Sequence, residues 1–197
     1  MLRNNFGRVF RRQTVFIQTE QTPNPATLKF LPGRPVMTSG TANFTSEEAA
    51  RISPLAERLF SLPEVTGVFL GADFVTVSKT DEGDWYLLKP AILAAIMEHF
   101  TAGRPLLLAD AIQGAVTNDE EDDEVVAQIK ELLETRVRPA VAQDGGDITF
   151  YDFEDGVVYL HMQGSCSGCP SSTATLKAGI ENMLRHYIPE VVEVRAV

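Results

Sequence analysis

An acidic run near the middle of the chain limits how this sequence can fold. Residues 118–124, NDEEDDE, hold six acids in seven positions. Side chains of one charge repel one another and are not buried together, so the run favours a solvated connection. It follows the glycine-containing stretch AIQGAV, and we predict a linker over residues 111–122. Acidic side chains are also favoured in the first turn of a helix, near the positive end of its dipole. The acidic run can therefore be both the end of a linker and the start of a helix.

The linker divides the 197 residues into two parts of small-domain size. A hydrophobic content of 44% with 22% charged residues is typical of a folded globular chain. We therefore predict an α/β (α+β) protein of two small domains, over residues 16–110 and 123–197. The net charge of −10 argues against a general nucleic-acid binder. The longest apolar run, near residues 91–97, is too short to span a membrane.

The first 16 residues differ from the rest of the chain, because they contain four arginines and no acid. Mitochondrial presequences share this composition, although this segment is short and has few serines. A basic tail or a start codon placed too early explains the same composition. We predict a basic, disordered extension over residues 1–15. It has no apolar segment of the kind that a secretory signal contains.

The upstream domain shows both strand and helix patterns. Strands are predicted at residues 15–21, 27–31 and, as a pair around a turn, 65–79; helices are predicted at residues 46–62 and 85–103. Pro54 either kinks the first helix or marks its true start. Gly103 is expected to end the second helix.

The downstream domain has the predicted order α-β-β-α-β. A first helix with one apolar face ends at the Gly145–Gly146 pair, and a hairpin over residues 147–164 turns at Asp155–Gly156. A second amphipathic helix over residues 172–188 leads to a closing strand. Three strands covered by two helices form a modest independent core.

The two cysteines of the chain, Cys166 and Cys169, lie three positions apart in a loop before the second helix. Gly164 and Gly168 let the loop wrap closely, and Pro170 fits the first turn of the helix. A helix N-terminus stabilises thiolates, which are the reactive and metal-binding form of cysteine. The spacing therefore predicts metal binding or redox chemistry at this loop.

Three interpretations of this C-x-x-C pair remain open. The first is a structural pair of buried thiols, which is unfavourable here because the glycine-rich loop is expected to be exposed. A thioredoxin-like dithiol redox pair usually follows the first strand of a βαβ unit, whereas a hairpin precedes this one. Zinc and iron–sulfur clusters need about four ligands. A two-fold dimer would supply four thiolates, and His99, His161 and His186 lack ligand spacing to the cysteines.

Several motifs of this sequence resemble the Nfu family of iron–sulfur cluster scaffold and carrier proteins. In the downstream domain they are Arg138–Pro139, Asp144–Gly145–Gly146–Asp147, the stretch from Gly164 through Cys166 and Cys169 to Pro170, and then Ser172, Thr173 and Leu176. Upstream, FIQTEQTPNPATLKFLPG and VTGVFLGADFVTVSK resemble the family's N-terminal domain. The resemblance covers nearly everything from residue 16 on and is closest to the mitochondrial and alphaproteobacterial type.

The resemblance implies a non-enzymatic carrier. A homodimer would hold one [4Fe-4S] cluster through Cys166 and Cys169 of both chains. The cluster would come from upstream cluster-assembly machinery and pass to apo-proteins such as lipoyl synthase or aconitase-type enzymes. The location would be the bacterial cytoplasm, or the mitochondrial matrix for a eukaryotic source. The N-terminal domain, which has no cysteine, would serve targeting or client docking, or act as a folded spacer.

Two acidic segments invite a metal-binding interpretation, and we predict another role for each. We expect Asp144–Asp147 to end a helix and begin a strand, with a glycine in the left-handed conformation. Neither Asp144 nor Asp147 is predicted as a ligand. The acids of residues 119–124 could bind iron weakly, but a solvated linker is the stronger interpretation.

Overall fold

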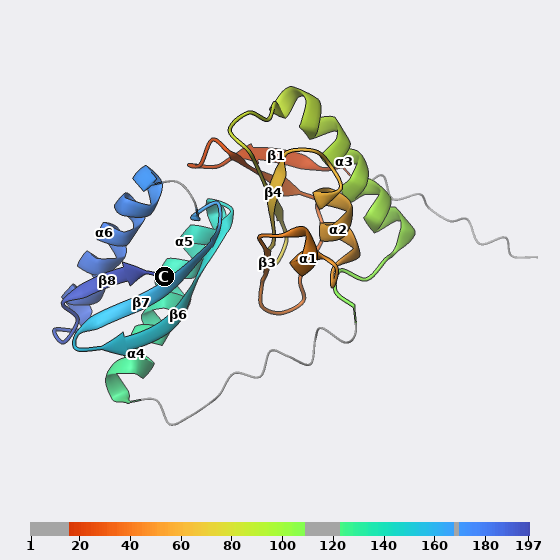
Figure 1. The fold of residues 1–197 in the computed structure, drawn as a ribbon. Helices are drawn as coiled ribbons and strands as arrows, with labels where there is room; N and C mark the ends of the chain where they lie inside the picture. Colours follow the sequence, from red (N-terminus) through yellow and green to blue (C-terminus); the bar gives the residue numbers. More distant parts are fainter. Residues whose placement is uncertain (1–15, 109–122, 168–169) are drawn as a thin grey trace, which may run out of the picture.

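A computed structural model describes residues 16–108, 123–167 and 170–197, without the side chains of residues 170–172. The chain forms two β-sheets, each with its own hydrophobic core (Figure 1). The α/β fold class is confirmed. The predicted extension over residues 1–15 and the linker over residues 111–122 lie outside the described residues, so the domain boundaries stay predictions. Among the described helices, none combines the length and apolarity needed to cross a bilayer.

The N-terminal domain, residues 16–108, is built on an antiparallel five-stranded sheet with the order β1-β2-β5-β4-β3. Its strands are β1 (Gln18–Gln21), β2 (Thr27–Leu31), β3 (Ala42–Phe44), β4 (Val65–Leu70) and β5 (Val75–Lys79). Four of them fall within the predicted strand segments. The short edge strand β3 was not predicted.

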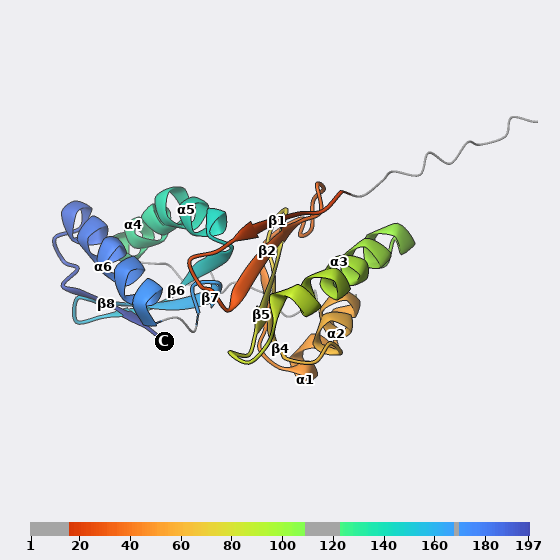
Figure 2. The same cartoon turned by 90° about the horizontal axis from the view of Figure 1, so that it is seen from above.

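Helices α1 (Glu47–Ala50), α2 (Pro54–Phe60) and α3 (Trp85–Ala102) cover one face of this sheet (Figure 2). The segment predicted as one helix over residues 46–62 is divided, because Pro54 begins a new helix that the Ser53 hydroxyl caps at the Ala56 N–H. Gly103 ends α3 in the left-handed conformation, with φ of +64°, as predicted.

Part of the opposite face of the N-terminal sheet is also buried. Along β2, Leu28 and Phe30 enter the core under the helices, whereas the alternate residues Thr27 and Lys29 point the other way and are equally covered. Thr76 of β5 repeats this pattern. The cover is the C-terminal domain, whose strand β7 contacts β4 and β5 (Figure 2).

The C-terminal domain, residues 123–197 as far as they are described, has the predicted order α-β-β-α-β. Its elements are α4 (Glu124–Leu132), the π-helical turn η2 (Leu133–Val137), α5 (Arg138–Gln143), β6 (Gly146–Glu154), β7 (Val157–Gly164), α6 (Pro170–Tyr187) and β8 (Glu193–Ala196). Strands β6 and β7 form an antiparallel hairpin, and β8 pairs with β7 in parallel. Both helical segments pack on one face of the sheet (Figure 2).

The predicted first helix of this domain is continuous but irregular. The Arg138 N–H donates to the carbonyl of Leu133, five residues earlier, which defines the π turn. Pro139 follows immediately and has no N–H to continue the regular pattern. The irregularity places Arg138 at the start of α5, where its side chain reaches β6.

Candidate functional site

The cysteine loop lies between β7 and α6, and its described part is Ser165–Ser167. Gly164 begins it with φ of +65°, and a Cβ atom there would lie 2.7 Å from the Gly145 carbonyl oxygen. Only glycine combines this conformation with so close an approach. The loop is therefore held directly against the Gly145–Gly146 turn between α5 and β6.

Cys166 points into the C-terminal core rather than toward solvent. Its side chain is 6% exposed and belongs to the apolar cluster between the sheet and its helices. The thiol lies against Gly146, where a Cβ atom would come within 2.6 Å of Sγ. The expectation that the loop is exposed is thus wrong for Cys166, because Gly146 leaves room for the sulfur inside the fold.

Burial also sets the protonation state of this thiol. Desolvation raises the pKa of Cys166 to about 11, and the charges of Asp144 and Asp147 act in the same direction. The neighbouring Ser165 side chain opposes this rise through a hydrogen bond. The structure therefore holds Cys166 as a neutral thiol. Its predicted partner Cys169 lies outside the described residues.

Hydrogen bonds attach the loop to its surroundings on both sides of Cys166. Before it, Ser165 donates from its hydroxyl to the Asp144 carbonyl and from its N–H to the Gly145 carbonyl at 3.2 Å. After it, the Thr173 hydroxyl in the first turn of α6 donates to the Cys166 carbonyl at 3.0 Å. The position of Cys166 therefore depends on the turn after α5.

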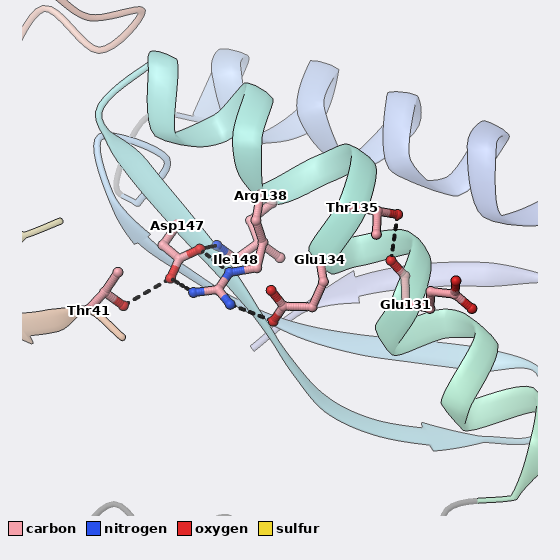
Figure 3. A network of polar contacts seen from close by, with 7 residues as sticks. All are labelled: Thr41, Glu131, Glu134, Thr135, Arg138, Asp147 and Ile148. Atoms are coloured by element: carbon pink, nitrogen blue, oxygen red, sulfur yellow. Dashed lines mark hydrogen bonds and ion pairs between the residues drawn. The ribbon is translucent and has the colours of Figure 1, made fainter. Parts of the chain in front are cut away.

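Arg138 and Asp147 form a salt bridge that fixes this turn (Figure 3). The guanidinium donates from Nε and Nη2 to the two oxygens of Asp147, both at 2.7 Å, and a third donor reaches Glu134. The hydrogen bond to Asp147 is the main cause of a raised Arg138 pKa. Asp147 also accepts from the N–H of Ile148. Its oxygens are thus engaged in holding α5 to the start of β6.

The Asp144–Asp147 segment has the structural role that the sequence predicts. Helix α5 ends at Gln143, Gly145 has φ of +84°, and β6 begins at Gly146. A glycine in the left-handed conformation lets the last carbonyls of the helix accept hydrogen bonds and turns the chain back toward the sheet.

The three histidines lie apart from Cys166. His161 is on β7, where its Nδ1–H donates to the main-chain oxygen of Val197 at 3.1 Å and its ring makes an edge contact with the ring of Tyr151. His99 is buried in α3 of the other domain, and His186 is exposed on α6 beside Tyr187. Within the described ranges, no group of three or more histidine, cysteine, aspartate or glutamate side chains is placed to hold a metal ion.

Among the described residues, four side chains of the N-terminal domain donate hydrogen bonds to the cysteine loop and its neighbouring turn, and no local sequence pattern predicts these contacts. They are Asn24, Lys29, Thr41 and Thr76, which donate to acceptors between residues 142 and 167. Beside them lies a cleft of about 350 Å³, lined by Asn24, Phe69 and other residues of the N-terminal domain together with Gly164 and Ser167. The site is therefore composed of both domains.

Comparisons with known proteins identify the family to which this chain is similar. The family model "Scaffold protein Nfu/NifU N terminal" matches residues 17–103, and "NifU-like domain" matches residues 129–195. The chain is 55% identical to the mitochondrial NFU1 iron–sulfur cluster scaffold homolog of Homo sapiens, over 93% of this chain and 72% of that protein. The chain belongs to the Nfu family. The family resemblance expected from the sequence is thus confirmed.

Other Nfu relatives are similar over the same region. The chain is 54% identical to the mitochondrial NifU-like protein 4 of Arabidopsis thaliana, over 92% of this chain and 65% of that protein. It thus spans slightly less than two thirds of that relative's length. Among solved structures, a NifU-like protein from Saccharomyces cerevisiae aligns with a TM-score of 0.46 and 25% identity, over 53% of this chain and 94% of that chain. A score this low adds no argument to the family assignment.

Proposed function

We propose that this chain is an iron–sulfur cluster scaffold and carrier, and not an enzyme. Its relatives include proteins named as iron–sulfur cluster scaffold homologs at about 55% identity. That similarity is the observation that carries the proposal. The same relatives lend no support to the thioredoxin-like alternative, which we do not pursue.

In this proposal Cys166 and Cys169 are the cluster ligands. They are the two cysteines of the chain, and iron–sulfur clusters are held by thiolates, commonly four of them. Two copies of the chain supply four, so a [4Fe-4S] cluster would bridge a homodimer with two-fold symmetry. A bridging site between subunits lies near solvent, which suits release of the cluster more than permanent storage.

The cluster is therefore cargo. It would arrive from upstream assembly machinery and be transferred to apo-proteins that need it, such as lipoyl synthase or aconitase-type enzymes. We place this activity in the mitochondrial matrix, because the relatives from Arabidopsis thaliana, Homo sapiens and Drosophila virilis are all named as mitochondrial. They do not support the alternative location in a bacterial cytoplasm.

Anaerobic reconstitution tests the proposal. Loaded protein is expected to contain about four irons and four sulfides per dimer and to sediment as a dimer. Cys166→Ser and Cys169→Ser should each abolish both cluster and dimer, whereas Ser167→Ala, a small change at an exposed residue between the two cysteines, should keep both. A full cluster in either cysteine variant contradicts the ligand assignment. Zinc in protein purified without oxygen would favour a zinc-bridged dimer instead.

A further inference from the structure

The N-terminal domain donates hydrogen bonds to the C-terminal domain around the cysteine loop. The donor side chains are Asn24, Lys29, Thr41 and Thr76, which we call the interdomain clamp. Their acceptors are the Ser167 carbonyl at 3.2 Å, the Ala142 and Gln143 carbonyls at 3.1 and 3.0 Å, the Asp147 carboxylate at 2.9 Å and the Gly145 carbonyl at 2.8 Å. In each of these contacts the N-terminal domain supplies the donor, so the two surfaces are complementary in polarity. Figure 3 shows the contribution of Thr41, which reaches Asp147 from the other domain.

Lys29 is the central member of the clamp. It lies in the middle of β2 and is only 6% exposed, although a lysine is rarely buried unless its charge is paired. Its ammonium group caps carbonyls at the end of α5, where a cation is favoured by the helix dipole. Glu20 at 3.5 Å and the ring of Phe74 complete its surroundings. This environment for Lys29 includes both domains and exists only while they are in contact.

The clamp holds the loop on both sides of Cys166. Asn24 binds the carbonyl of Ser167, directly after the cysteine. Thr76 binds the carbonyl of Gly145, which also accepts from the N–H of Ser165, directly before it. The ring of Phe69 lies against Gly164, and a Cβ atom added at Gly164 would be 3.1 Å from this ring. The loop therefore cannot turn while these contacts persist.

The buried thiol and the proposed shared cluster are incompatible in this conformation. A cluster that bridges two chains needs the sulfur of Cys166 to face a second copy, whereas here it faces Gly146 inside the fold. Moving the backbone of residues 164–167 would turn the sulfur outward. Such a movement breaks the hydrogen bonds to Asn24 and Thr76.

The contact between the domains has features of a surface that can separate. Its hydrogen-bonding groups can be satisfied by water when the domains part, so each hydrogen bond adds only modestly to stability. The main apolar group beside them is the buried ring of Phe69. The cleft of about 350 Å³ leaves the interface incompletely filled beside Ser167.

We propose that the N-terminal domain acts as a clamp that keeps the cysteine loop closed with Cys166 buried, and that separation of the domains releases the loop for cluster loading. The proposal rests on the proposed function in one respect, namely that Cys166 is a cluster ligand. It gives the N-terminal domain a regulatory role in addition to any part in client docking.

Thiol reactivity tests the clamp without any cluster. In the full chain carrying Cys169→Ser, Cys166 is the single thiol, and its rate of alkylation by excess iodoacetamide measures how often the loop opens. Lys29→Met should raise this rate about tenfold, as expected for losing hydrogen bonds from a charged donor. Lys29→Met combined with Thr76→Val should raise it further. Lys89→Met, the same change on the exposed surface of α3, is the matched control and should leave the rate unchanged.

Asn24→Asp guards against an effect of misfolding, because it keeps Oδ1, which accepts from the Ala26 N–H, and removes only the Nδ2 donor to Ser167. It too should speed alkylation, while the thermal melting curve followed by the fluorescence of Trp85 stays in place. Equal rates in all variants and the wild type would overturn the clamp. Faster alkylation without faster hydrogen exchange of the backbone amides at the contact between the domains would overturn the domain separation.

Cluster loading separates this proposal from the proposed function. With both cysteines present, Lys29→Met should take up cluster faster than the wild type and reach the same final content. If alkylation accelerates but no variant takes up a cluster, the clamp stands and the scaffold function fails. If the wild type loads normally and Lys29→Met changes neither rate, the function stands and the clamp is wrong.

Discussion

At the scale of single residues, Gly146 decides whether Cys166 fits inside the fold. A Cβ atom at this position would lie 2.6 Å from both the Cys166 sulfur and the Gln163 carbonyl oxygen. Gly146→Ala should therefore lower the free energy of unfolding of the C-terminal domain by about 1 to 3 kcal/mol, the usual cost of overpacking. Urea denaturation followed by far-UV circular dichroism measures this loss.

Gly179 provides the control for that substitution. It lies in α6, and a Cβ atom there would meet nothing within 4 Å. Gly179→Ala should raise the free energy of unfolding by about 1 kcal/mol, because alanine favours the helix. If Gly146→Ala were equally stabilising, the close packing of the cysteine loop on the Gly145–Gly146 turn would be wrong.

His99 is a second residue with a measurable signature. Its side chain is buried in α3, and its Nε2 makes no hydrogen bond with any described residue. Burial lowers the pKa of His99 below its ordinary value of 6.5, and the charge of Arg104 adds to this. The folded state thus resists a proton that the unfolded state accepts. Stability is fully present above about pH 6.5 and falls as the pH drops below it.

His99→Leu removes both the unpaired nitrogen and the proton uptake. It should raise the free energy of unfolding by about 1 kcal/mol near neutral pH, and the gain should grow as the pH falls. Urea titrations from about pH 8 to about pH 5, followed by the fluorescence of Trp85, report on this domain. His186→Gln, exposed on α6, is the control and should keep the wild-type pH dependence. A constant gain at every pH would contradict the role of protonation.

At the scale of secondary-structure elements, the Arg138–Asp147 pair joins α5 to β6. The Asp147 side chain is 5% exposed, so removing Arg138 leaves a nearly buried carboxylate with no opposite charge, held only by the Thr41 hydroxyl and the Ile148 N–H. Arg138→Met should lower the free energy of unfolding by about 2 to 4 kcal/mol. Arg138→Met with Asp147→Asn should recover part of this loss, because the unpaired charge is gone. Urea denaturation followed by circular dichroism measures both variants.

A salt bridge on the surface of α6 is the matched control. Arg185 pairs with Glu181 at 3.6 Å, and its side chain is half exposed. Arg185→Met should cost about 0.5 kcal/mol or less, as is common for exposed pairs. Equal losses in Arg138→Met and Arg185→Met would show that the bridge to Asp147 does not fix the turn below Cys166.

The elements that the sequence predicted well are those with strong local signals. Strand β2 was predicted at its observed bounds, and the hairpin of β6 and β7 turns at Asp155–Gly156, where both residues have positive φ. Strand β3 has only three residues, too few for an alternating pattern. The π turn η2 depends on hydrogen-bond geometry inside a helical pattern, which periodicity does not reveal.

At the scale of the whole molecule, the sequence predicted two units but not their contact. Lys29 stands between core residues in TLKFL, and alternation along the strand places it on the face away from that core. Its burial comes from α5, whose last carbonyls lie more than a hundred positions away in the sequence. The burial of Cys166 was missed for the same reason, because it depends on Gly146 across the loop. Contacts between distant segments leave no periodic signal in either one.

The net charge of the chain bears on its assembly. Each copy carries −10, so bringing two copies together around a shared anionic cluster costs electrostatic free energy. Salt screens this repulsion over roughly 10 Å at 0.1 M. The cluster-loaded dimer should therefore bind more tightly as the salt concentration rises from about 0.02 M to about 0.3 M, by a factor of about three to ten. Sedimentation velocity under nitrogen, with absorbance of the cluster as the signal, measures the dissociation constant.

The apo-protein at the same salt concentrations is the control, because without a cluster it has no shared ligand to hold two copies together. It should stay predominantly monomeric throughout this range. If the loaded dimer instead weakened with salt, specific ion pairs between the subunits would outweigh the general repulsion. In that case basic side chains near the loop, Arg138 among them, would contact the second copy. The salt bridge of Arg138 to Asp147 would then open on cluster loading.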